Sequence, residues 1–391
     1  GPLCGGTETA GHGPYAVQLQ RALTRHREEA RSKALAARAG KLPREDPRRL
    51  AYRNCDSLAA TWITSPPGEL DTIPPELLPM VAATYLGRPV PTLAREVGKR
   101  IGTSKAVVDE NGFALGVHRP GNLWIWRHDS LTNAVADDMA AAGLEVYVET
   151  SRVFEGAIPA QALSGFREGS RAERKGLIPD IAVRTGGEIQ MWENKTINTS
   201  DRRGGWYLTG KSSDPALAAQ PRGVEVRASA VPAGYARKAA IFDQRYCGTP
   251  LGQVGPLEAH LGSLPQVKAL VFGGYGEASA GARALIKDLA RETALRRERR
   301  EGFNCSDVGQ ATGVVAWWIT RRWGRLAVLS AAQVKDNALQ QVRGSPPALR
   351  EARARAPPPR GAEDAFWTHR RTASDQGDYS GRAFGGFSSW S

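Results

Sequence analysis

Cysteines are scarce in this chain and long apolar runs are missing, and each shortage excludes a class of protein. The four cysteines are widely separated, which argues against a disulfide scaffold and against a paired-cysteine zinc site. The longest apolar stretch, 314–320, ends at Arg321 and is far shorter than the ~20 residues of a membrane-spanning helix. We therefore expect an intracellular protein in a reducing compartment, with no membrane partner.

Positive charge, by contrast, is abundant. The 391 residues carry 53 Lys and Arg against 40 Asp and Glu, a formal net charge of +13. Such a surface attracts anionic partners, and nucleic acid is the first candidate because lysine and arginine neutralise backbone phosphates whatever the base sequence. A solvated basic surface with no partner is the plain alternative. Since 41% of the residues are hydrophobic, a folded core is expected.

Composition divides the chain into four parts. The expected parts are a partly disordered basic helical arm at 1–50, a helical and irregular lead-in at 51–125, an ordered core with C-terminal helices at 126–342, and a disordered tail rich in Pro, Arg, Gly and Ser at 343–391. The third part has the strongest hydrophobic periodicity, so it is the part expected to carry the chemistry.

The periodicity of the third part changes between that of helices and that of strands. Apolar residues recur every four residues from Leu131 to Met139, whereas 144–150 alternates like a strand. The turn pair Gly186-Gly187 joins two apolar strands into a hairpin. The expected elements are helices at 130–142, 233–246, 279–300 and 310–342 and strands at 144–150, 178–185, 188–197 and 267–272. This order predicts an α/β sandwich around a mixed sheet.

The hairpin carries the residues best suited to catalysis. Glu193 and Lys195 are two residues apart on its second strand, so their side chains project from the same face. Asp180 lies near the start of the first strand, and a tight hairpin brings it close to Glu193. We therefore expect two carboxylates and an ammonium to meet at the end of the sheet.

This set of side chains suits the hydrolysis of a phosphodiester. Two carboxylates can hold Mg²⁺, or Mn²⁺ in its place, with water completing the coordination shell. The metal polarises a phosphoryl oxygen and acidifies a water nucleophile. Lys195 can orient that water or neutralise the charge that develops on the phosphate.

A solvated strand face is the plain alternative, because Glu-x-Lys is common on exposed strands. Two features favour catalysis. Asp180 follows a proline at the start of an otherwise apolar strand, and Glu193 and Lys195 interrupt an equally apolar one. Charges at such positions are costly to bury without partners, and each other together with a metal would serve as partners.

The stretch 179–197 resembles the PD-(D/E)XK motif of restriction-endonuclease-like nucleases. More narrowly, Arg127-His128-Asp129 at a helix start, followed by IPD and ENKTI, is similar to the nuclease-like domain that follows the reverse transcriptase in non-LTR retroelements, and to related algal and fungal open reading frames. The similarity covers roughly 75–335 and includes YARKAAIFDQRYCGTP, VGPLEAHL and VFGGYGEAS. It implies a restriction-endonuclease-like three-layer sandwich, with a central mixed sheet flanked by helices and with helical additions.

The resemblance also implies roles for individual residues. Asp180 and Glu193 correspond to the metal ligands and Lys195 to the catalytic lysine. Arg127 and His128 match a helix-start pair beside this site, which makes His128 a candidate catalytic residue and Arg127 a candidate nucleic-acid contact. A capping or helix-packing role for His128 is the alternative, although the ordinary pKa of histidine, about 6.5, suits phosphate contact or proton transfer.

Two further features of the resembling families bear on metal binding. An acidic residue of the first helix often joins the site, and Asp137 and Asp138 are both candidates for that position. Retroelement domains often carry a Cys/His zinc knuckle before the Arg-His helix, but here 102–126 contains only His118 and no cysteine. We therefore predict no structural zinc.

Basic and aromatic residues after the hairpin are candidates for nucleic-acid contacts. Arg202, Arg203 and Lys211 lie in the polar loop that follows it, and Tyr235 and Lys238 lie one turn apart on the next helix. Cationic side chains can track phosphates and aromatic rings can stack on unpaired bases. The alternative places Tyr235 in the core and Lys238 in solvent.

Together these patterns predict a Mg²⁺-dependent endonuclease that hydrolyses DNA phosphodiester bonds and is linked to a mobile element. RNA is the alternative substrate, and the nucleus is the expected location. A second hypothesis is an inactive nuclease fold that only binds nucleic acid. A third is a structural protein whose basic surface meets acidic protein partners.

Overall fold

A computed structural model of the chain places most of the residues between 14 and 344. The described residues are 14–66, 72–102, 104–118, 123–150, 152–154, 156–159, 161–162, 177–185, 187–198, 222–301 and 308–344. The tail predicted at 343–391 lies outside them except for its first two residues.

A four-stranded mixed sheet forms the centre of the fold. Its strands follow one another in space in the order β1 (Glu145–Val148), β2 (Ile181–Thr185), β3 (Glu188–Thr196) and β4 (Lys268–Phe272). The first three strands are antiparallel, whereas β3 and β4 are parallel. The hairpin predicted between 178 and 197 is thus confirmed as β2 and β3, with Gly187 in its turn at φ +90°, a conformation that glycine adopts without strain.

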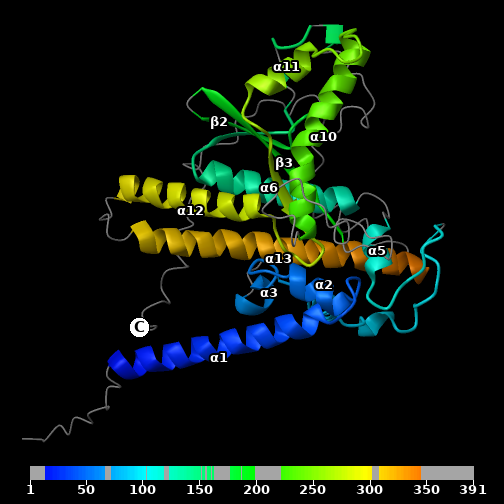
Figure 1. The fold of residues 1–391 in the computed structure, drawn as a ribbon, viewed down its shortest axis with the longest axis vertical. Coiled ribbons are helices and arrows are strands. Elements are labelled where there is room, and N and C mark those ends of the chain that lie inside the picture. Colours follow the sequence, from blue (N-terminus) through cyan, green and yellow to red (C-terminus); the bar gives the residue numbers. More distant parts are fainter. Residues whose placement is uncertain are drawn as a thin grey trace, which may run out of the picture.

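Helices cover both faces of this sheet, which gives three layers (Figure 1). One face packs against α6 (Leu123–Ala141), α12 (Ala280–Glu301) and α13 (Val308–Val342). The other face packs against α10 (Gly223–Tyr246) and α11 (Pro256–Ser263). Alternation along the strands separates the two cores: Trp192 belongs to the first and Met191 to the second. The chain is therefore an α/β protein with a mixed sheet between helical layers, as the sequence predicts.

The lead-in packs on the C-terminal half of α13. It consists of α2 (Pro47–Asn54), α3 (Thr61–Thr64), α4 (Leu78–Leu86), a 3-10 helix (Pro91–Leu93) and α5 (Phe113–Val117). Two apolar clusters join these segments to α13, one around Leu93 and Leu339 and one around Val81 and Val328. A second 3-10 helix (Arg152–Phe154) follows β1. Among the helices in the described part, none is both long and apolar enough to cross a membrane.

The N-terminal arm, which the sequence predicts to be helical within 1–50, contains the helix α1 (Pro14–Gly40). It lies beneath α13 and the lead-in and reaches the body at α2 (Figure 1). From residue 22 to residue 38 every side chain of α1 is exposed, and Ala39, at the end of the helix, is buried.

Three local details refine or correct what the sequence patterns suggest. The apolar segment 122–126 suits either a short strand or a helix lead-in, and the second is correct, since α6 begins at Leu123. The helix expected at 233–246 begins ten residues earlier, with Pro232 inside α10. The sequence also suits a basic face on α13 that includes Arg321 and Arg325. These two are instead buried, at 6% and 3% exposure, and donate to lead-in carbonyls, those of Pro66 and Ser65 among them.

Candidate functional site

The hairpin brings Asp180, Glu193 and Lys195 together at one end of the sheet. The register pairs Ile181 with Trp192, so Asp180 stands opposite Glu193 across the two strands. The Lys195 ammonium lies 3.5 Å from Asp180 Oδ2 and also contacts Glu193 Oε1. A single cationic group therefore lies between two carboxylates, one from each strand.

Backbone and side-chain donors hold both carboxylates in place. The Asn194 backbone N–H donates to Asp180 Oδ2 at 2.7 Å, and the Tyr235 hydroxyl donates to Glu193 Oε2 at 2.6 Å. Tyr235 comes from α10, on the same face of the sheet as Glu193. Glu193 is 1% exposed and Asp180 is 9% exposed, so neither carboxylate is a solvated surface charge. This burial argues against the alternative that Glu193 and Lys195 lie on a solvent-exposed strand face.

The surroundings push the two carboxyl pKa values in opposite directions. Burial raises the pKa of Glu193, and the nearby negative charge of Asp180 raises it further, against the contacts with Lys195 and Tyr235. Burial also acts to raise the pKa of Asp180, but the charges of His128 and Lys195 and the Asn194 N–H outweigh it and lower that pKa. Neighbouring acidic groups whose surroundings push their pKa values apart are candidates for a functional site.

His128 reaches the same carboxylate from α6, on the other side of the sheet. Its Nε2 lies 3.2 Å from Asp180 Oδ2 and 3.0 Å from the Asn194 carbonyl oxygen, and its Nδ1 lies 3.1 Å from Asp129 Oδ1. Burial opposes a charged ring, but the carboxylates of Asp180 and Asp129 raise the pKa of His128 to about 10. At neutral pH the imidazole is therefore a second cation beside Asp180.

Arg127, the neighbour of His128, points elsewhere. It is 1% exposed, and its guanidinium donates to the carbonyls of Ile197 (3.2 Å) and Gly273 (2.7 Å) and to the side chain of Asn198. These groups lie just beyond the ends of β3 and β4, so Arg127 fastens α6 to the sheet beside the site. A nucleic acid cannot reach a guanidinium enclosed in this way, and the predicted nucleic-acid contact is replaced by a structural one.

The two candidate acids of the first helix do not join the site. Asp138 accepts from Arg322 at 2.9 Å and from the Trp323 indole at 2.7 Å, and Asp137 pairs with Arg322 at 3.2 Å. Asp137 is nine residues beyond His128, which places it roughly 13 Å further along the helix. Both aspartates thus link α6 to α13.

The residues expected to contact nucleic acid differ in how exposed the structure leaves them. Tyr235 is 4% exposed and bonded to Glu193, so its hydroxyl supports a carboxylate. Lys238 is half-buried one turn further along α10, where burial lowers its pKa and Glu193 acts to raise it. Arg227, which the sequence did not point to, is a second cation of α10 near Glu193: burial lowers its pKa and the charge of Glu193 acts to raise it. Its only sequence signal is its place on the α10 face that carries Tyr235. The loop residues Arg202, Arg203 and Lys211 lie outside the described residues.

A partly buried charge network, also unpredicted, anchors the start of α10. Asp56 of the lead-in accepts from Arg222 at 2.8 Å and from Arg283 at 2.9 Å, and Arg222 donates to Glu225 at 2.6 Å. The network joins the lead-in, α10 and α12. Its members are up to 227 residues apart in the chain, so no local sequence pattern predicts it. It fixes the helix that presents Tyr235 to Glu193.

Two carboxylates and water would have to supply the ligands of a cation at this site. In the described part of the chain no three His, Cys, Asp or Glu side chains are grouped so as to hold a metal ion. Mg²⁺ is commonly bound through one or two carboxylates with several retained waters. The Lys195 ammonium lies against both carboxylates, so a positive charge of the chain itself already occupies this position.

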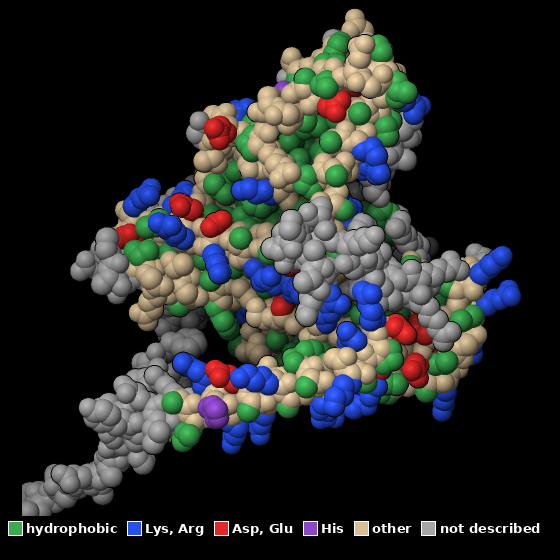
Figure 2. Space-filling view, viewed as in Figure 1, with side chains coloured by type: hydrophobic (Ala, Val, Ile, Leu, Met, Phe, Trp, Pro, Cys, Tyr) green, Lys and Arg blue, Asp and Glu red, His purple; other side chains and the backbone are tan. Residues whose placement is uncertain are grey.

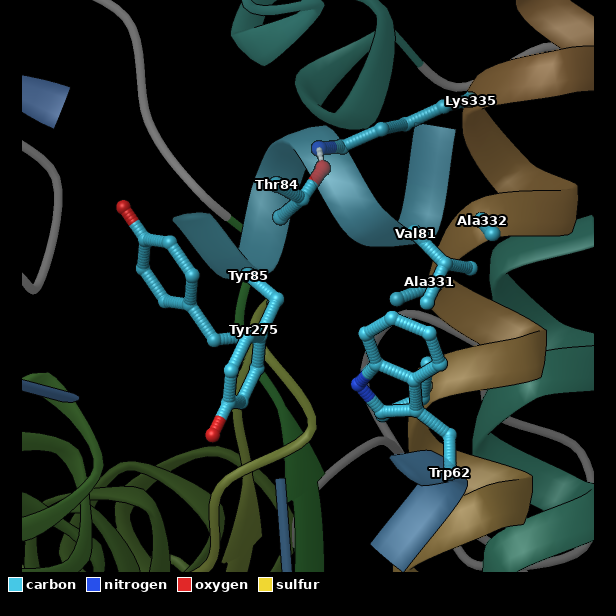
Figure 3. A pocket seen from close by; sticks show the side chains of 10 residues that line it. Trp62, Val81, Thr84, Tyr85, Tyr275, Ala331, Ala332 and Lys335 are labelled. Atoms are coloured by element: carbon cyan, nitrogen blue, oxygen red, sulfur yellow. Dashed lines mark hydrogen bonds between the residues drawn. The ribbon is translucent and has the colours of Figure 1, made fainter. Parts of the chain in front are cut away.

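A separate cavity of about 10 Å³, with room for one water, lies between α3, α4 and α13 (Figure 3). Lys335 enters it from α13, is 3% exposed, donates to the Thr84 hydroxyl at 3.0 Å and stands 5.7 Å from the centre of the Phe113 ring. Burial lowers the pKa of Lys335 to about 8. This lysine faces no carboxylate at ion-pair distance within the described residues, so its charge is a cost to the fold.

Replacing Lys335 with methionine is therefore expected to stabilise the protein by about 1–2 kcal/mol at pH 7. Because the folded pKa lies near 8 and the unfolded one near 10.5, the unfolded state binds more protons between these values, and stability should rise with pH across that window. Urea unfolding at pH 7 and 9.5 measures both effects. Lys335→Met should lose the pH dependence, whereas Lys287→Met, at an exposed position, should keep it. A less stable Lys335→Met protein at pH 7 would contradict the argument.

Comparison with known proteins found no match: no family model, curated protein or solved structure is significantly similar to this chain.

Proposed function

We propose that this protein is a metal-dependent nuclease with a restriction-endonuclease-like core, which hydrolyses phosphodiester bonds in DNA. One observation carries the proposal: a buried aspartate, a buried glutamate and a lysine converge at the end of a hairpin, with the lysine between the acids. The mixed sheet between helical layers supports the fold assignment, and the net charge of +13 supports a nucleic-acid substrate. The link to a mobile element, and with it a nuclear location, rests on the sequence resemblance.

Asp180 and Glu193 are the residues that would hold Mg²⁺ or Mn²⁺. Such an ion supplies Lewis acidity at the phosphoryl oxygen and lowers the pKa of a bound water. With an ion held there, Lys195 would remain beside the carboxylates, where an ammonium can orient a water or neutralise charge on a phosphate. His128 keeps its contact with Asp180 and adds a second positive charge on the side of α6. Tyr235, whose pKa is raised well above 10 by burial and by Glu193, remains a hydrogen-bond donor to that carboxylate.

The proposal is tested first by metal binding and cleavage in the parent protein. At a Mg²⁺ concentration ten times the dissociation constant, a bound ion stabilises the fold by about 1.4 kcal/mol, or roughly 2 °C in melting temperature. Asp180→Asn should lose this shift. Asp129→Asn is the matched control, because Asp129 contacts the same imidazole but lies outside the carboxylate pair, so it should retain the shift. Supercoiled plasmid should be nicked by the parent in Mg²⁺ and not in EDTA. A parent that neither binds Mg²⁺ nor nicks DNA would refute the proposal.

A nucleic-acid-binding protein without cleavage is the second candidate. It is favoured by the ion pairs of Lys195, which already neutralise the carboxylates without a metal. The same assays distinguish it, since it predicts salt-sensitive DNA binding with no nicking and no Mg²⁺-dependent shift.

A further inference from the structure

The helix α1 is a long cationic rod that buries almost nothing against its own protein. Its 27 residues span about 40 Å. Between residues 22 and 38 it carries five Lys or Arg against two Glu, all of them exposed. Figure 2 shows these basic side chains projecting along the helix at the lower edge of the molecule. A helix that is polar all round has no apolar stripe to pack against its own protein, so packing on the body does not account for it.

Three arginines form a line on one face of this helix. Arg27, Arg31 and Arg38 fall within about 40° of one another at 100° per residue, and the first and last are roughly 16 Å apart along the axis. Within the described part of the chain no carboxylate lies within 4 Å of any of them. Their charges are therefore available to an external anion.

The cationic surface continues past the end of α1 onto α2. Arg44, Arg49 and Arg53 stand close enough that burial and the charges of the first two lower the pKa of Arg53. Residues 14–54 together carry eleven Lys or Arg and four Asp or Glu, a net charge of +7 out of the chain's +13. More than half of the excess charge is thus concentrated in about a tenth of the sequence.

The chemistry of this surface selects among possible partners. A second copy of α1 would bring its own excess of positive charge against this one, so self-association is disfavoured by repulsion. Residues 21–40 contain no Phe, Tyr or Trp on which unpaired bases could stack, which disfavours a single strand. A regular row of phosphates, such as the backbone of a duplex, matches a rigid row of guanidiniums without any need for base contacts.

We propose that α1, with its line Arg27, Arg31 and Arg38, is an arm that binds the phosphate backbone of duplex DNA away from the carboxylate site. The inference rests on the proposed function only for the choice of nucleic acid as the partner. Since the arm is joined to the body at α2, DNA held on it stays near the molecule between cleavage events.

Fluorescence anisotropy with a 30-bp duplex in EDTA, from 50 to 200 mM KCl, measures the arm's contribution. The variant Arg27→Gln/Arg31→Gln/Arg38→Gln should bind at least about 10-fold more weakly at 100 mM salt, and the slope of log K against log salt should fall by about 2–3. The control Lys287→Gln/Arg291→Gln/Arg299→Gln removes the same charge from exposed or part-exposed positions on α12 and should bind within about 3-fold of the parent. Circular dichroism should show both variants folded, because the arm residues are exposed.

Three results would overturn the inference: parental affinity in the arm variant, an equal loss in the α12 control, or a loss confined to a single-stranded probe. Sedimentation that shows an arm-dependent dimer with unchanged DNA binding would assign the surface to a second copy instead. Failure of the proposed function looks different. If the parent never nicks plasmid in Mg²⁺ but binds duplex through the arm, the nuclease is refuted and the arm stands. If nicking occurs and the arm variant binds normally, the arm is refuted alone.

Discussion

Lys195→Met is expected to slow Mg²⁺-dependent plasmid nicking by on the order of 10²–10³-fold, the usual cost of removing one preorganised charged or hydrogen-bonding group from a transition state. The ammonium is the only cation that contacts both Asp180 and Glu193 among the described residues. Methionine keeps the length of the side chain and removes the charge, so the loss reports on electrostatics more than on packing. Initial rates on supercoiled plasmid measure the effect.

The natural control is Lys268→Met on the adjacent strand. Lys268 is exposed, pairs in register with Trp192 and stands 4.8 Å from that ring, away from the carboxylates. Its replacement should leave nicking unchanged. If Lys195→Met nicks plasmid as fast as the parent, catalysis by this lysine is excluded.

A second readout separates loss of chemistry from loss of structure. Without the ammonium, two buried carboxylates face one another and repel, and a divalent cation can relieve that repulsion. Mg²⁺ should therefore raise the melting temperature of Lys195→Met by more than it raises that of the parent. A variant that is inactive but strongly stabilised by Mg²⁺ has lost the catalytic group and kept the ligands.

The part of the site that was predictable from sequence is the part built by local geometry. Glu193 and Lys195 share a strand face by the two-residue period, and the short turn at Gly187 sets the register that places Asp180 opposite Glu193. These relations span fewer than twenty residues, so sequence order nearly determines them. The strands and the long helices were predictable for the same reason, since each is set by its own apolar periodicity.

The parts that sequence could not assign depend on packing between distant segments. Asp138 appears on α6 as a possible ligand, but its partners Arg322 and Trp323 lie about 185 residues away. Tyr235 on α10 suits stacking on a base as well as it suits Glu193, and only the packing of α10 on the sheet decides between them. Arg127 is the clearest case, because nothing near it in sequence indicates that three groups beyond the sheet would enclose it.

Arg127→Met is expected to destabilise the fold by about 2–4 kcal/mol, which corresponds to a drop of roughly 3–6 °C in melting temperature. The variant leaves the carbonyls of Ile197 and Gly273 buried without their charged donor, and buried acceptors without partners carry the full cost of desolvation. Relief from burying the guanidinium charge offsets part of this loss, which is why the expected value is below the sum of the bonds. Thermal and urea unfolding measure it.

Arg322→Met supplies the matched comparison, since it removes an arginine of equal size that pairs with Asp137 and Asp138. Its side chain is 41% exposed, so the pair is partly screened and its loss should cost no more than about 1 kcal/mol. Arg127→Lys should fall between the two, because an ammonium lacks the planar fork that spans the two strand ends. Equal stability of Arg127→Met and the parent would show that α6 is fixed to the sheet by its apolar face alone. If Arg127→Met also breaks the contact between His128 and Asp180, this buried arginine positions the site without touching its carboxylates.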